Sequence, residues 1–134
     1  MSVELLQVIP TLAGALRVAL PASVQVWEHV PETPAPPCVV IEPGDDFVQE
    51  DDDATFREPT MIATFDLFLL VQLDDEHDNE SANTQLLQLL PALLDTCREL
   101  DDVWIVGMSK PQAFLTTEWV HHGVRVSVQT RVTL

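Results

Sequence analysis

Residues 61–73, MIATFDLFLLVQL, decide the fold of this chain. Every odd position from Met61 to Leu73 is apolar, while the even positions mix apolar and polar side chains. A period of two with one wholly apolar face predicts a long strand packed against helices, with its second face partly covered. Asp66 lies on that second face, where solvent or a subunit contact would satisfy its carboxylate.

The C-terminal residues 124–134 show the same alternation. One side carries five apolar side chains, those of Val124, Val126, Val128, Val132 and Leu134. The other side carries five polar side chains, those of Arg125, Ser127, Gln129, Arg131 and Thr133. This pattern predicts a strand with one face on the core. We expect it to pair with an antiparallel strand over 112–120, with His121, His122 and Gly123 as the turn. Shorter strands are expected at 24–28, 39–41 and 103–108.

Two segments carry apolar residues at helical spacing instead. They are residues 5–20 and about 79–100, where Pro10 and Pro91 interrupt the pattern and predict a kink, a break or a later start. Prolines between 31 and 37 indicate a stiff connector. The order of elements predicts a single α+β domain over residues 1–134, with a mainly antiparallel sheet and two helices packed on one face.

The charge of the chain is localised. The 134 residues carry a formal net charge of -16, and residues 42–102 hold 18 of the 22 acidic residues with only two basic ones. Most of these acids form three runs, at 45–53, 74–78 and 101–102. Residues 43–59 have no periodicity and are predicted to be a long acidic loop or a hairpin arm with a function of its own.

Motifs for catalysis are absent from the sequence. Its four glycines are scattered rather than gathered in a phosphate-binding loop, and it has no nucleophile elbow and no paired metal-ligand motif. The run at 74–78 lacks the spacing and the glycine of a calcium loop, and His121 and His122 would point to opposite faces of a strand. We therefore expect no enzyme, no catalytic residue, no cofactor and no metal site beyond weak Mg²⁺ screening of the acids.

Other features fit a cytosolic protein without a membrane span. The apolar runs are shorter than the roughly 20 residues needed to cross a bilayer, and residues 1–4 lack the basic start of a secretory signal. Cys38 and Cys97 are expected to be buried free thiols in a reducing compartment. Three tryptophans, Trp27, Trp104 and Trp119, are expected in the core or at a subunit interface.

The order of elements resembles the tail terminator proteins of long-tailed bacteriophages over most of the chain. The resemblance rests on an N-terminal helix, the run PPCVVIEPGDDF at 36–47, the strand FDLFLLV at 65–71, a leucine-rich helix, and GVRVSVQ at 123–129. It implies a homo-oligomeric ring, commonly a hexamer, at the head-proximal end of the virion's tail, assembled in the bacterial cytoplasm. Its partners would be the tail tube protein and the head–tail connector.

This role suggests where the charges act. Six copies would carry about -96 in total, and an acidic channel would repel phosphates, so that DNA passes without specific binding. We hypothesise that Asp74, Asp75, Glu76 and Asp78 line the channel. A second set is assigned to contacts with a neighbouring subunit or the tube: Asp45, Asp46, Phe47, Glu50, Asp51, Asp52, Asp53, Arg125 and Arg131.

Three alternatives stay open at this point. A head-completion or tail-joining protein of the phage neck has a similar size and similar strands. An acidic DNA mimic is a second alternative, although its carboxylates would follow an elongated surface rather than loops. An enzyme that uses Asp66 or the acids at 74–78 is the third.

Overall fold

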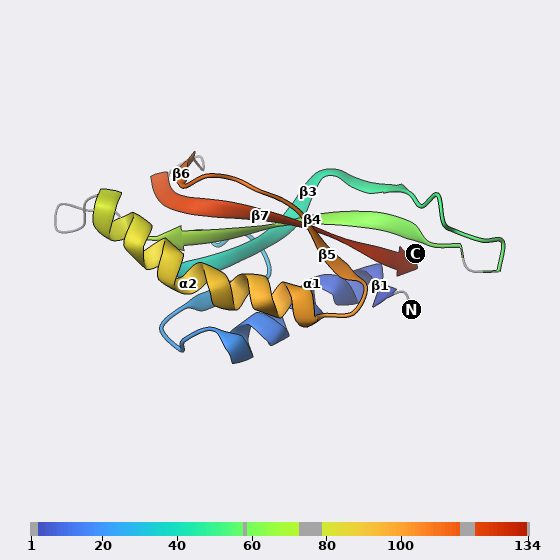
Figure 1. Cartoon of the computed structure of the whole chain (residues 1–134), viewed down its shortest axis with the longest axis horizontal. Coiled ribbons are helices and arrows are strands. Elements are labelled where there is room, and N and C mark those ends of the chain that lie inside the picture. The colour runs from blue at the N-terminus through green and yellow to red at the C-terminus, as the bar shows by residue number, and fades with distance from the viewer. Residues whose placement is uncertain (1–2, 58, 73–78, 116–119, 134) are drawn as a thin grey trace.

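The computed structural model describes residues 3–57, 59–72, 79–115 and 120–133. Its elements follow the order β1 (Val3–Glu4), α1 (Leu5–Ala19), β2 (Gln25–Trp27), β3 (Cys38–Glu50), β4 (Met61–Val71), α2 (Asn79–Glu99), β5 (Val103–Met108), β6 (Gln112–Leu115) and β7 (Val120–Thr133). Within these residues the strands form one sheet, and both helices lie on the same side of it (Figure 1). The predicted α+β fold with two helices on one face is therefore confirmed.

The sheet is centred on the two strands with the clearest alternation. Strand β4 lies between β3 and β7 and is antiparallel to both. Strand β7 also pairs with β6, then β5, then β1 along its length. Only the short β1 and β2 pair in parallel with their neighbours. The directly opposed pairs Phe65–Val128 and Leu67–Val126 place the apolar faces of β4 and β7 on the same side.

The core lies between this apolar side and the helices. Its largest fully buried side chains come from α1, α2 and the central strands, and they include Leu12, Leu16, Ile41, Phe65, Leu67, Leu69, Leu86 and Leu93. Pro10 and Pro91 both lie within continuous helices, so neither ends its helix. No helix in the described ranges is both long enough and apolar enough to cross a bilayer.

The turn predicted at residues 121–123 is wrong. His121, His122 and Gly123 lie inside β7, where His122 is opposite Val71 and Gly123 is opposite Leu70. The connection between β6 and β7 falls at 116–119, outside the described residues, as does Trp119. The two histidines do point to opposite faces, since His122 contacts Asn83 of α2 at 2.6 Å and His121 lines a pocket on the other side.

Both cysteines are buried free thiols, as predicted. Cys97 packs in the main core, and Cys38 packs with Val40 and Leu70 in a small cluster on the opposite face of the sheet. Burial raises the pKa of each thiol to about 11. Both groups are thus protonated and poorly nucleophilic near neutral pH.

Candidate functional site

Residues 43–60, here called the arm, extend from one end of the sheet (Figure 1). The first part, residues 43–50, continues β3 and pairs with β4 at Pro43 and again at residues 48–50, so it is an irregular hairpin strand rather than an open loop. The register shifts between Pro43, which is opposite Phe65, and Val48, which is opposite Ala63. Asp46 has a φ of 50° within this irregularity. A bulge of this kind bends the strand and re-aims its side chains.

The arm presents most of its acidic side chains to solvent but turns one aromatic inward. Asp45, Asp46 and Glu50 are exposed. Phe47 is only partly exposed, because its ring packs edge-on against Phe65 with the centroids 5.3 Å apart at 86°. Phe47, predicted to be a contact residue for a neighbour or the tube, therefore also anchors the arm to the core.

A polar cluster joins the two ends of the outer part of the arm, residues 51–60, here called the arm tip. The carboxylate of Asp51 accepts hydrogen bonds from Thr60 Oγ1 at 2.6 Å, from the backbone N–H of Asp53 at 3.0 Å and from Arg131 Nε at 3.0 Å. Arg131 Nη2 also donates to Asp53 Oδ2 at 2.9 Å. We call these four residues the Asp51 cluster. They join both ends of the tip to β7, which lies two strands away from β3 in the sheet.

We expect Asp51→Ala to release the arm tip while leaving the rest of the fold intact. The substitution removes the shared acceptor of Thr60, Asp53 and Arg131. Amide hydrogen exchange should then accelerate at least tenfold in residues 51–57, with little change in β4 and β7. Asp52→Ala is the matched control, because Asp52 is exposed. Equal exchange in the two variants would contradict a holding role for Asp51.

The same cluster makes the tip sensitive to acid. The hydrogen bond from Thr60, chiefly, lowers the pKa of Asp51, with further lowering by Asp53 and Arg131 against the opposing effect of burial. A lowered pKa in the folded state contributes stability above the unfolded pKa, and this contribution is lost as the pH falls through the folded value. Protection of the amides at 51–57, measured relative to intrinsic exchange at the same pH, should therefore fall as the pH drops below the ordinary aspartate value of 3.8 and through the lowered pKa of Asp51.

The sheet face away from the helices carries a polar ladder across its central strands. Ser127 Oγ donates to Asp66 Oδ1 at 2.7 Å, so a neighbouring strand of the same chain satisfies this carboxylate in part. Gln129 Nε2 donates to Thr64 Oγ1 at 3.2 Å, and Trp104 Nε1 donates to Gln129 Oε1 at 3.3 Å. The guanidinium of Arg131 lies 5.7 Å from the centre of the Trp104 ring. The ladder thus runs from β4 to β5 and into the Asp51 cluster.

An apolar pocket of about 120 Å³ lies at the other end of this face. Its lining includes Phe68, Leu70, Phe114, His121 and Glu42. Burial, together with the charge of Asp66 directly opposite on β4, raises the pKa of Glu42. The pocket has few polar groups converging on it, and no group of three or more metal-binding side chains occurs among residues 3–57, 59–72, 79–115 and 120–133.

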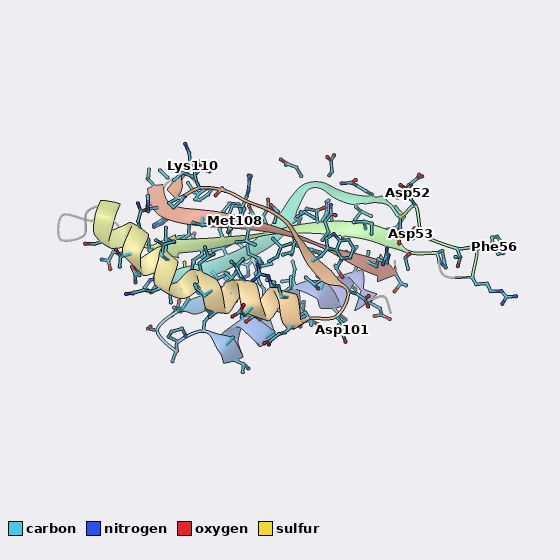
Figure 2. The ribbon with its side chains drawn as sticks, in the orientation of Figure 1. Asp52, Asp53, Phe56, Asp101, Met108 and Lys110 are labelled. Carbon is cyan, nitrogen blue, oxygen red and sulfur yellow. The ribbon has the colours of Figure 1, made fainter. Side chains whose placement is uncertain are left out.

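The outer side of β5 exposes apolar side chains to solvent. Val106 and Met108 are 48% and 51% exposed. A shallow groove runs along the strand and is lined by Leu94 and Arg98 of α2 and by Val103, Trp104, Ile105 and Met108 of β5. Lys110, which follows β5, is exposed on the same part of the molecule (Figure 2).

The structure places the predicted site residues in different settings. Asp52 and Asp53 lie on the arm, and Arg125 is exposed on β7. Arg131 is bound by acids of its own chain. The hypothesised channel residues Asp74, Asp75, Glu76 and Asp78 lie outside the described part of the chain.

Sequence reasoning missed Phe56. Its side chain is fully exposed at the far end of the arm (Figure 2). An aromatic residue within the polar stretch after Glu50 was the available signal.

Comparison with known proteins adds no relative to this description. No protein-family model matches the chain, and a search of curated proteins finds no significant match.

Proposed function

We propose that the chain is a structural protein of a bacteriophage tail. In this proposal, copies form a ring, six by the resemblance, on the head-proximal end of the finished tail tube, where they stop elongation and provide the joint to the head connector. The observation that carries the proposal is a combination of two features. An acidic arm projects from the sheet, and the two outer edges of the sheet are formed by different strands. Such a subunit can meet unlike surfaces on its two sides, as a ring requires.

The charge distribution supports the same role. The arm alone holds seven acidic residues and one basic residue. A ring that concentrates carboxylates would repel the phosphates of passing DNA and keep the duplex from binding to its wall. Divalent cations and salt would screen the repulsion between the acids of neighbouring copies.

Deletion of the gene from the phage that encodes it tests this function. Electron microscopy of the lysate should show overlong tails without heads, and wild-type protein supplied in trans should restore tails of normal length. Tails of normal length that fail to join heads would instead identify a joining protein of the neck. Normal infectious virions would overturn the proposal.

The purified chain gives a second, independent readout. Light scattering across a concentration series, with and without Mg²⁺, should show species larger than a dimer at high protein concentration. An acidic DNA mimic would stay a monomer or dimer and would compete with DNA for a DNA-binding protein.

A further inference from the structure

Several strands have a side on which no described strand pairs, and two of these free edges lie at the outer part of β3 and at β5. Strand β2 pairs with β3 only at Cys38, Val39 and Val40. Within residues 43–50, Pro43 and residues 48–50 pair on one side only, with β4, and the register shift lies between them. Strand β5 likewise pairs only with β7 among the described strands. These two free edges lie on opposite sides of the same sheet. Free strand edges present unpaired backbone N–H and C=O groups, which readily pair with another chain.

Strand directions make the two edges compatible. Strands β3, β4, β7 and β5 are successive neighbours in the sheet, and each is antiparallel to the next. A second copy in the same orientation would therefore place its β3 antiparallel to β5 of the first. Contact between two different edges is heterologous, and repeated heterologous contacts close into a ring when the rotation permits.

Charge and shape favour this contact as well. In an antiparallel pairing the start of the 43–50 segment meets the end of β5, which brings Asp45 and Asp46 close to Lys110. Four of the six basic residues of the chain lie on or beside β5, namely Arg98, Lys110, Arg125 and Arg131. The incoming strand would also cover the groove between α2 and β5 and the exposed Val106 and Met108.

We propose that residues 43–50 of one copy add to β5 of the next as an antiparallel strand, so that a single sheet continues from subunit to subunit. This inference rests on the proposed ring and names the surfaces that form it. The pairing involves at most six residues of β5 and is small beside the roughly 1,200–2,000 Å² of a standard stable interface. Association of the chain alone is therefore expected to be weak and to increase with concentration.

Chemical cross-linking of mixed cysteine variants tests the contact. Gln49→Cys and Val106→Cys each place a thiol on one of the two edges, at exposed positions. Mixed and treated with a short bismaleimide, they should give a mixed dimer, and the double variant should give a ladder of higher multimers. The native thiols should react slowly because both are buried. Val18→Cys, on the 88% exposed Val18 of α1, replaces Val106→Cys in the control mixture.

A charge exchange tests the orientation. Lys110→Glu, added to the Val106→Cys variant, should reduce its cross-linking with the Gln49→Cys variant at least fivefold. Asp45→Lys, added to the Gln49→Cys variant, should then restore the cross-linking. Three outcomes would each overturn the proposal. In the first, Val18→Cys cross-links to Gln49→Cys as strongly as Val106→Cys does; in the second, Val106→Cys forms dimers with itself in preference to mixed dimers. In the third, Asp45→Lys does not restore the cross-linking that Lys110→Glu removes.

The phage assay separates this inference from the proposed function. Lys110→Glu should give overlong tails in the deletion background, and the Asp45→Lys, Lys110→Glu double variant should shorten them again. If the protein ends tails normally with Lys110→Glu and no mixed cross-link forms, the edge contact is wrong while the capping role stands. If deletion leaves tails normal, the capping role is wrong whatever the cross-links show.

Discussion

Gly123→Ala should destabilise the fold by about 3 kcal/mol, in the range for overpacking a tight site. A Cβ at this position in β7 would overlap the backbone carbonyl oxygen of Leu69 and lie 2.9 Å from Leu70 Cδ2. The first of these atoms belongs to the neighbouring central strand, so relief requires β4 or β7 to move. Because Gly123 also pairs with Gln112 of β6, that movement would disturb both sides of β7.

Gly14→Ala is the matched control for this substitution. Gly14 is an exposed position within α1, and a Cβ there would meet no heavy atom within 4 Å. Alanine should stabilise the helix by about 1 kcal/mol, because glycine loses more backbone entropy on folding. Urea unfolding followed by circular dichroism measures both variants. A stable Gly123→Ala protein would show that β7 has room to move away from β4 at this point.

The same glycine shows why the sequence misplaced a turn. A glycine that follows two polar residues is typical of a turn, and the sequence has no sign that Gly123 instead lies close to the backbone of Leu69. Both explanations predict a glycine, and only the packing of β4 against β7 separates them. The alternation from Val124 to Val132, by contrast, correctly predicted which face of β7 is buried, because a strand with one buried face has a fixed period.

The arm was harder to predict for a related reason. Alternation fails between Pro43 and Val48 because the register shifts there, so a strand that continues to Glu50 looked like an irregular segment. The Asp51 cluster joins residues 80 positions apart in the chain, and no local pattern indicates such a contact. The composition did show that this segment is acidic, but not that one of its acids binds Arg131.

The hydrogen bonds of the Asp51 cluster reduce the number of cations that are available for the proposed subunit contacts. Arg131 was predicted to face acids of a neighbouring copy, but its guanidinium already binds Asp51 and Asp53. Exposed Arg125 and Lys110 have no ion pair with the described residues, and both lie near the end of β5. A neighbour's acids would therefore gain more from these two cations than from Arg131, whose charge is already partly neutralised.

Phe65→Ala should cost about 4 kcal/mol, a typical loss for a buried phenylalanine. Phe65 is 1% exposed and is among the largest fully buried side chains of the core. Phe56→Ala is the matched control, because the Phe56 side chain is fully exposed at the tip and its removal should leave the free energy of unfolding unchanged. Thermal and urea unfolding measure both losses.

The Phe65 substitution should also loosen the arm, because Phe47 packs edge-on against the same ring. A double-mutant cycle with Phe47→Ala isolates this contact, and we expect a coupling free energy of about 1 kcal/mol between the two aromatic rings. Hydrogen exchange in residues 44–50 should accelerate in either single variant. A coupling near zero with unchanged exchange would mean that β4 pairing alone holds the arm. The position of the arm would then not depend on its contact with the core. A change in the stability of the core would therefore leave the conformation of the arm, and its contact with a partner, unaffected.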